Sequence, residues 1–166
     1  MDIFEFAMEK ETYAEQFYRE LADRTDSTGL KNVLNMLADE EVKHYRTVQA
    51  MQTQAGGKPT STPVLKRAEE IFRGMKDGAE RFRFDGGEVN LYRKACEIEK
   101  QSRDFYSQKA GEVRNEEHKT IFHQLAEEEN KHLTLVQRLC DFVARPETFL
   151  EDAEMYHFDD YVEGEF

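Results

Sequence analysis

The chain has 166 residues, enough for one domain with a buried core, and its 23 basic and 35 acidic residues give a net charge of −12. This acidity argues against nucleic acids and anionic membrane surfaces as partners. No apolar run approaches the roughly 20 residues of a membrane span, and the N-terminus lacks the basic and apolar regions of a signal peptide. We therefore expect a cytoplasmic protein that binds neither nucleic acid nor membrane.

Apolar residues recur at helical spacing in four long segments. A short turn at residues 25–29 separates the first two segments, and Asn115 is the predicted N-terminal cap of the fourth. A shorter amphipathic segment covers residues 64–84, and Asp85-Gly86-Gly87 is expected to break it. The four long helices are predicted at residues 3–23, 30–54, 89–113 and 117–144.

The lengths of the connections predict the topology. Helices joined by a short turn form an antiparallel hairpin, so we expect hairpins at residues 1–55 and 89–144. The crossover at residues 56–88 exceeds thirty residues, which suits a ferritin-like bundle with one long connection. The predicted fold class is therefore all-α, a four-helix bundle over residues 1–146 whose crossover contains a short helix.

An internal repeat with an offset of 88 residues carries most of the functional information. Over roughly fifty paired positions the two halves align without an insertion, so each half is predicted to be one hairpin of the same length. The pattern is one glutamate followed by a Glu-x-x-His motif, which occurs once in each half. Its residues are Glu11, Glu41 and His44 in the first half, and Glu99, Glu129 and His132 in the second.

These acids are distinguished from the others by their position on the helices. In the second and fourth helices the motif fills a gap in the apolar stripe, and Glu11 and Glu99 lie on the core-facing line of the first and third. Four carboxylates facing one another in a core would need compensating charge, which two divalent cations supply. The pattern therefore predicts a dinuclear metal site. The alternative is an ordinary charged bundle with hydrogen-bonded core histidines.

The ligand chemistry narrows the choice of metal. Residues at i and i+3 share a helix face, so one helix can offer a carboxylate that bridges two metals and an imidazole that holds one. Oxygen-rich ligation with one nitrogen per metal favours iron or manganese over zinc. The neighbouring glutamates are expected on solvated faces or next to the ligands. These neighbours are Glu9, Glu40, Glu97 and Glu128.

Two further pairs of residues stand out. Tyr18 and Tyr106 follow the first glutamate of each half by seven residues, and they are candidates for a hydrogen bond to a ligand carboxylate or for an aromatic layer that closes the site. Cys96 and Cys140 form no Cys-x-x-Cys motif, so neither a disulfide framework nor a thiolate metal site is indicated. We expect both cysteines to be small buried apolar residues.

The segments around the motifs resemble the rubrerythrin branch of the ferritin-like superfamily. The resemblance rests on residues 11–18 and 37–44 and on their copies in the second half, and it covers about residues 3–144. It implies a non-haem site of two iron ions that reacts with peroxide or dioxygen, with manganese or a mixed pair as alternatives. It also implies that the six residues of the repeated pattern are the ligands, with Glu41 and Glu129 as the bridges.

The chain departs from this family in two respects. It lacks the four cysteines of a rubredoxin-like module, so we expect a separate electron donor, such as a rubredoxin-like protein. Many rubrerythrins carry an extra glutamate where this chain has Ser102, which argues against the metal shift that accompanies oxidation in that family. No catalytic group beyond the metal ligands is predicted.

These observations predict a di-iron oxidoreductase that reduces hydrogen peroxide, or dioxygen, in the defence against oxidative stress. The alternatives are a ferroxidase that handles iron and a non-enzymatic acidic scaffold. We expect a homodimer, which a repeat with a long crossover could also form by domain swapping. Residues 147–166 are predicted to be an acidic, aromatic tail that packs on its own bundle or on a second copy, or that docks a redox partner.

Overall fold

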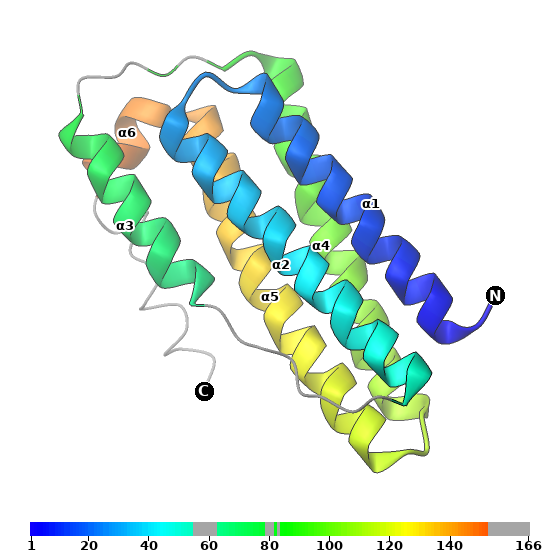
Figure 1. Ribbon diagram of the computed structural model, residues 1–166. Helices are drawn as coiled ribbons and strands as arrows, with labels where there is room; N and C mark the ends of the chain where they lie inside the picture. The colour runs from blue at the N-terminus through cyan, green and yellow to red at the C-terminus, as the bar shows by residue number, and fades with distance from the viewer. Residues whose placement is uncertain (55–62, 79–81, 83, 153–166) are drawn as a thin grey trace.

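The computed structural model describes residues 1–54, 63–78, 82 and 84–152 (Figure 1). These residues form six helices and no strand, so the all-α expectation is confirmed. No helix in the described part of the chain is both long and apolar enough to cross a membrane. The helices are α1 (Ile3–Arg24), α2 (Thr28–Thr53), α3 (Val64–Asp77), α4 (Gly86–Glu112), α5 (Glu116–Ala144) and α6 (Pro146–Glu151).

Side-chain caps determine where the four long helices begin. Asp2, Ser27, Asp85 and Asn115 each accept a hydrogen bond from the backbone N–H three residues further on, at 2.8–3.2 Å. The cap predicted at Asn115 is therefore confirmed. Asp85 was expected to belong to a helix break. It lies between α3 and α4 as expected and caps α4, because its carboxylate satisfies a backbone donor that the first turn of the helix leaves free. Gly86 and Gly87, which were expected to belong to the same break, are instead the first residues of α4.

The long helices pair as expected from their connections. α1 packs mainly on α2 and α4 mainly on α5, and the two hairpins meet where α1 contacts α4 and α2 contacts α5. α3 belongs to the crossover and lies outside the bundle against α2 and α5 (Figure 1). It ends at Asp77, which is earlier than the predicted end of the amphipathic segment. The ferritin-like arrangement of two hairpins and one long crossover is therefore confirmed.

The core consists of two apolar clusters with a polar layer between them. Along each long helix, a residue of the first cluster lies on one side of this layer and a residue of the second cluster lies on the other side. On α2, for example, Ala38 belongs to the first cluster, Val48 belongs to the second, and the Glu-x-x-His motif lies between them. The fold therefore encloses the polar layer between two water-excluding walls.

The first part of the predicted tail belongs to the core. α6 begins at Pro146 and brings Phe149 onto the bundle, where its ring is completely buried. The ring centroid of Phe149 lies 5.3 Å from that of Phe72 in α3 and 5.7 Å from that of Phe142 in α5. For this part of the tail, packing on its own bundle is confirmed. Residues 153–166 lie outside the described residues.

Candidate metal centre

The polar layer contains all six residues of the repeated pattern. One chain supplies them from α1, α2, α4 and α5, and each is at most 2% exposed. Their burial explains the gap in the apolar stripes, because these polar positions face the same interior as the apolar residues around them. The residues brought together are Glu11, Glu41, His44, Glu99, Glu129 and His132.

The Nδ1 atoms of the two histidines define two halves of this group. His44 Nδ1 lies 3.7 Å from Glu11 Oε2 in the neighbouring helix of its own hairpin. His132 Nδ1 lies 3.7 Å from Glu99 Oε1 in the same way. Each hairpin therefore contributes one imidazole and one glutamate at matching distances, as the repeat requires.

The remaining two glutamates contact both halves. Glu41 lies 3.6 Å from His44 Nδ1 of its own helix and 3.1 Å from His132 Nδ1 across the bundle. Glu129 lies 3.8 Å from His132 Nδ1 and 2.7 Å from His44 Nδ1. These two carboxylates therefore lie between the two histidine–glutamate pairs, where a carboxylate could bridge two metal ions.

The two tyrosines of the repeat contact the carboxylates of the opposite hairpin. Tyr106 Oη donates a hydrogen bond to Glu11 Oε1 at 2.5 Å, and Tyr18 Oη donates one to Glu99 Oε1. Burial is the main reason that the pKa of each tyrosine is raised well above its usual range, and the nearby carboxylates add to the effect. Both hydroxyls therefore remain protonated donors. The crossing of these bonds between hairpins did not follow from the sequence.

The four carboxyl groups differ in their affinity for protons. Burial, reinforced by the neighbouring carboxylates, raises the pKa of Glu41 and of Glu129 well above its usual range. Burial also acts to raise the pKa of Glu11 and Glu99. Hydrogen bonds from the neighbouring glutamate, histidine and tyrosine outweigh it and lower both values. Without metal, these directions favour protons on Glu41 and Glu129, the central pair, and ionised carboxylates at Glu11 and Glu99, the outer pair.

The histidines complete the charge balance. Burial alone would lower the pKa of His44 and of His132, but the adjacent carboxylates raise both above the usual range. These directions favour protonated histidines beside ionised Glu11 and Glu99 in the metal-free protein. Protons thus supply the positive charge that metal ions would otherwise provide, which explains how a core can hold six ionisable groups.

Two further glutamates approach the same histidines. Glu40 and Glu128 precede the central glutamates Glu41 and Glu129 and are only 2% and 7% exposed, so of the two expected places, a solvated face or a position next to the ligands, the structure supports the second for both. Each lies near a lysine one turn on, Lys43 at 3.1 Å and Lys131 at 3.6 Å. Glu9 and Glu97, at the corresponding places on α1 and α4, are exposed as expected.

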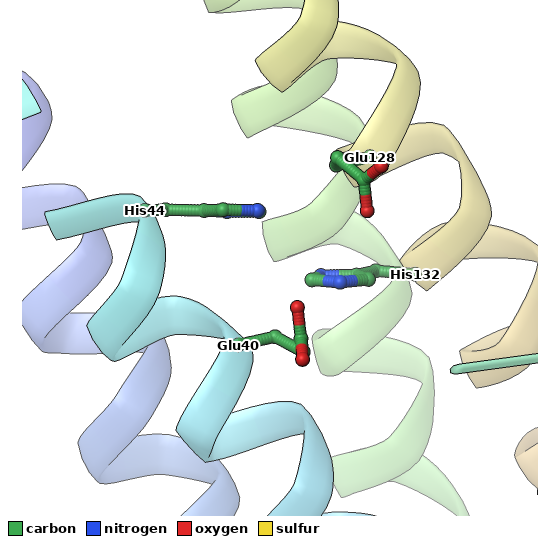
Figure 2. A group of neighbouring side chains, drawn as sticks. All are labelled: Glu40, His44, Glu128 and His132. Carbon is green, nitrogen blue, oxygen red and sulfur yellow. The ribbon is translucent and has the colours of Figure 1, made fainter. Parts of the chain in front are cut away.

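Figure 2 shows this second group, with Glu40 and His44 projecting from α2 and Glu128 and His132 from α5 into the space between the helices. One ligand atom from each of the four residues lies within 4.8 Å of the others. The two imidazole rings stack with centroids 5.2 Å apart. The doubled glutamates at 40–41 and 128–129 were the sequence signal for these neighbours, since both doublets recur at the offset of the repeat.

Several polar atoms of the layer indicate that it is built for metal ions. Glu11 Oε2, Glu99 Oε2, Glu129 Oε2 and the Nε2 atoms of both histidines are buried, and they have no hydrogen-bond partner among the described residues. Such atoms are costly in a core unless another group satisfies them. Oxygen and imidazole donors in this number suit a pair of first-row divalent metals. The buried carboxylate and histidine group therefore fits a di-iron site.

Comparison with known proteins agrees with this geometry. The family model described as Rubrerythrin matches residues 2–140 and, in a second match, residues 89–158. The second match begins close to the start of α4, as expected for a chain that contains the hairpin twice. No match is found among the curated proteins or among the solved structures. Because this family model matches most of the length of the chain, the chain belongs to the rubrerythrin family.

Proposed function

We propose that the chain is a di-iron oxidoreductase that reduces hydrogen peroxide with electrons from a separate donor protein. The observation that carries this proposal is the arrangement of the buried layer, in which two histidine–glutamate pairs lie on either side of two central glutamates. Family membership supports the choice of iron over other divalent metals.

The distances suggest which residues would hold each ion. His44 and Glu11 would bind one iron and His132 and Glu99 the other, because each histidine approaches only the outer glutamate of its own hairpin. Glu41 and Glu129 would bridge the two ions, since each contacts both histidines. Bridging carboxylates hold two metals at a short separation and neutralise much of their charge.

The surrounding residues would orient the ligands and keep bulk water out. The hydroxyl of Tyr18 holds one oxygen of Glu99, and that of Tyr106 holds one oxygen of Glu11. The second oxygen of each of these two glutamates is buried and has no hydrogen-bond partner among the described residues. The two apolar clusters close the layer along the bundle axis.

Peroxide reduction consumes two electrons and two protons and yields two molecules of water. When bound, two iron ions would supply the electrons, one from each ion. The separate donor, such as a rubredoxin-like protein, would then return both electrons. We further propose that the chain acts as a homodimer. Each copy would still have a complete site, because a single chain supplies all six residues.

The test is a stopped-flow comparison of the ferrous-loaded protein mixed anaerobically with hydrogen peroxide or with dissolved dioxygen. We expect the peroxide reaction to be faster, and repeated additions of a reductant to support further turnovers. The Glu41→Gln variant, which keeps the shape of the residue but removes a bridging charge, is the matched control and should show neither reaction.

The opposite order of rates would contradict the proposal. A protein that reacts faster with dioxygen and passes ferric iron on would be a ferroxidase that handles iron. Failure to bind iron at all would leave an acidic helical scaffold.

A further inference from the structure

The two cysteines of the chain, far apart in the sequence, face each other on the outside of the second hairpin. Cys96 lies on α4 and Cys140 on α5, and their Sγ atoms are 3.4 Å apart. Both side chains pack against the first apolar cluster but are half-buried rather than buried, so the expectation of small buried apolar residues holds only in part. A disulfide has an S–S length of about 2.05 Å, so only a small movement of the two sulfur atoms separates the pair from a bond.

A small oxidant can reach this pair. Both cysteines line an open hollow of about 840 Å³ over α4 and α5. The exposed side chains of Arg93 and Lys94 form part of its rim. The pair therefore differs from cysteines that are protected from oxidation by burial.

The surroundings of the two sulfur atoms are unequal. The hydrogen bond from Cys96 lowers the pKa of Cys140, with a further contribution from Arg93. The same hydrogen bond, together with burial and the nearby Glu99 and Glu97, raises the pKa of Cys96. Because the thiolate is the nucleophile in thiol oxidation, Cys140 is the cysteine suited to react first and Cys96 the one suited to resolve the product.

We propose that Cys96 and Cys140 are a reversible dithiol–disulfide pair that hydrogen peroxide oxidises independently of the metal centre. The Cys140 thiolate attacks one peroxide oxygen, so that an S–O bond forms, the O–O bond breaks, and hydroxide leaves and takes up a proton to become water. Cys96 then attacks Cys140 Sγ, so that the S–S bond forms, the S–O bond breaks, and a second water leaves with the Cys96 proton. The two sulfurs lose two electrons and the two peroxide oxygens gain them.

The bond would join the two helices that supply half of the metal ligands. Cys96 lies one turn before Glu99 on α4, and Cys140 lies about two turns after His132 on α5. A disulfide here would hold α4 and α5 in register beside the site when peroxide is abundant. A small thiol or dithiol reductant would return the pair by exchange, becoming a disulfide itself.

The test uses the full-length chain in its metal-free form, reduced and then treated with one equivalent of hydrogen peroxide. We expect both free thiols to disappear and the intact mass to fall by two hydrogen atoms, without a covalent dimer. The metal-free form separates this reaction from iron chemistry, so the result does not depend on the proposed function. Dithiothreitol should restore both thiols.

Two variants assign the roles. Cys96→Ser should stop at a sulfenic acid on Cys140 that dimedone traps, whereas Cys140→Ser should slow the oxidation of the remaining thiol by about tenfold or more. Thiols that persist in the unsubstituted chain, disulfides formed only between chains, or oxidation of each cysteine to sulfinic acid without a disulfide would overturn the proposal.

Discussion

The two hairpins agree closely at the polar layer and differ on their outer surfaces. Glu11, Glu41 and His44 in the first hairpin have exact counterparts 88 residues later, and the distances within each half nearly match. On the outside, Met8 and Gln52 occupy the places that Cys96 and Cys140 occupy in the second hairpin. The second hairpin is also the one that α6 covers.

This difference shows which constraints act on the repeat. Under the proposed function, residues that face the layer would have to supply the same donor atoms on both sides, because a pair of metal ions needs matched ligands. Outward-facing residues carry no such requirement, so the two hairpins are free to carry different chemistry there. We therefore expect substitutions at two positions related by the repeat to have equal effects on iron binding and stability when both positions face the layer. Outside the layer we expect the effects of such substitutions to differ.

The largest paired effect is expected at the central glutamates. Glu41→Gln and Glu129→Gln should each abolish tight binding of both iron ions, because each removes a bridging charge while it keeps the side-chain volume. Iron counted after anaerobic loading and gel filtration measures the effect. The exposed pair Glu9→Gln and Glu97→Gln is the matched control and should bind normally. Two irons retained in either central variant would refute its role as a bridge.

Metal binding should release protons from both halves together. In the metal-free protein, the raised pKa values leave protons on Glu41, Glu129, His44 and His132. Metal ligation requires the deprotonated groups. Titration calorimetry with a divalent metal, in buffers of different ionisation enthalpy, should therefore detect up to four protons released per site near neutral pH. Release of none would contradict the charge assignment.

The same protons predict how the melting temperature of the metal-free protein, and its gain on metal loading, depend on pH. A group whose pKa is raised by folding stabilises the fold below its unfolded value and loses that contribution as pH rises through the folded value. The metal-free melting temperature should thus fall as pH rises above the ordinary histidine value of 6.5. The gain from metal loading should grow over the same range. A gain that is independent of pH would count against this assignment.

Outside the layer, the packing of α6 on the second hairpin should contribute much of the free energy of unfolding. Phe149→Ala removes a completely buried ring from the contact of α6 with α3 and α5. We expect a loss of about 3–5 kcal/mol in the free energy of unfolding, measured by chemical denaturation. Phe6→Ala, which truncates a ring that is 44% exposed, is the control. A loss no greater than in the control would show that α6 is not part of the core.

A smaller, paired effect is expected at the tyrosines. Tyr18→Phe and Tyr106→Phe each delete one hydrogen bond to a buried carboxylate of the opposite hairpin. Each should lower the stability of the metal-free protein by about 1.5–3 kcal/mol, and by similar amounts. Tyr13→Phe, at a half-exposed position, should have no effect. Strongly unequal losses of stability in the two variants would contradict the equivalence of the two hairpins at the layer.

Local patterns predicted most of this architecture. The apolar periodicity located the four long helices to within a few residues, and the repeat identified the six residues that meet in the layer. The sequence left Glu40 and Glu128 open between a solvated face and a place beside the ligands, because a residue next to a core-facing position lies about 100° round the helix from it. Their burial depends on how the side chains of α2 and α5 meet across the layer. The docking of Phe149 and the contact of the two cysteines depend on packing between distant segments, which periodicity does not report.

Anaerobic titration of the metal-free chain with ferrous iron tests the central claim most directly. The arrangement of two histidine–glutamate pairs around Glu41 and Glu129 predicts two tightly bound iron ions per chain, with both lost together in the Gln variants. Iron binding near zero in the unsubstituted chain would contradict the dinuclear centre, and the layer would then be a proton-neutralised polar core.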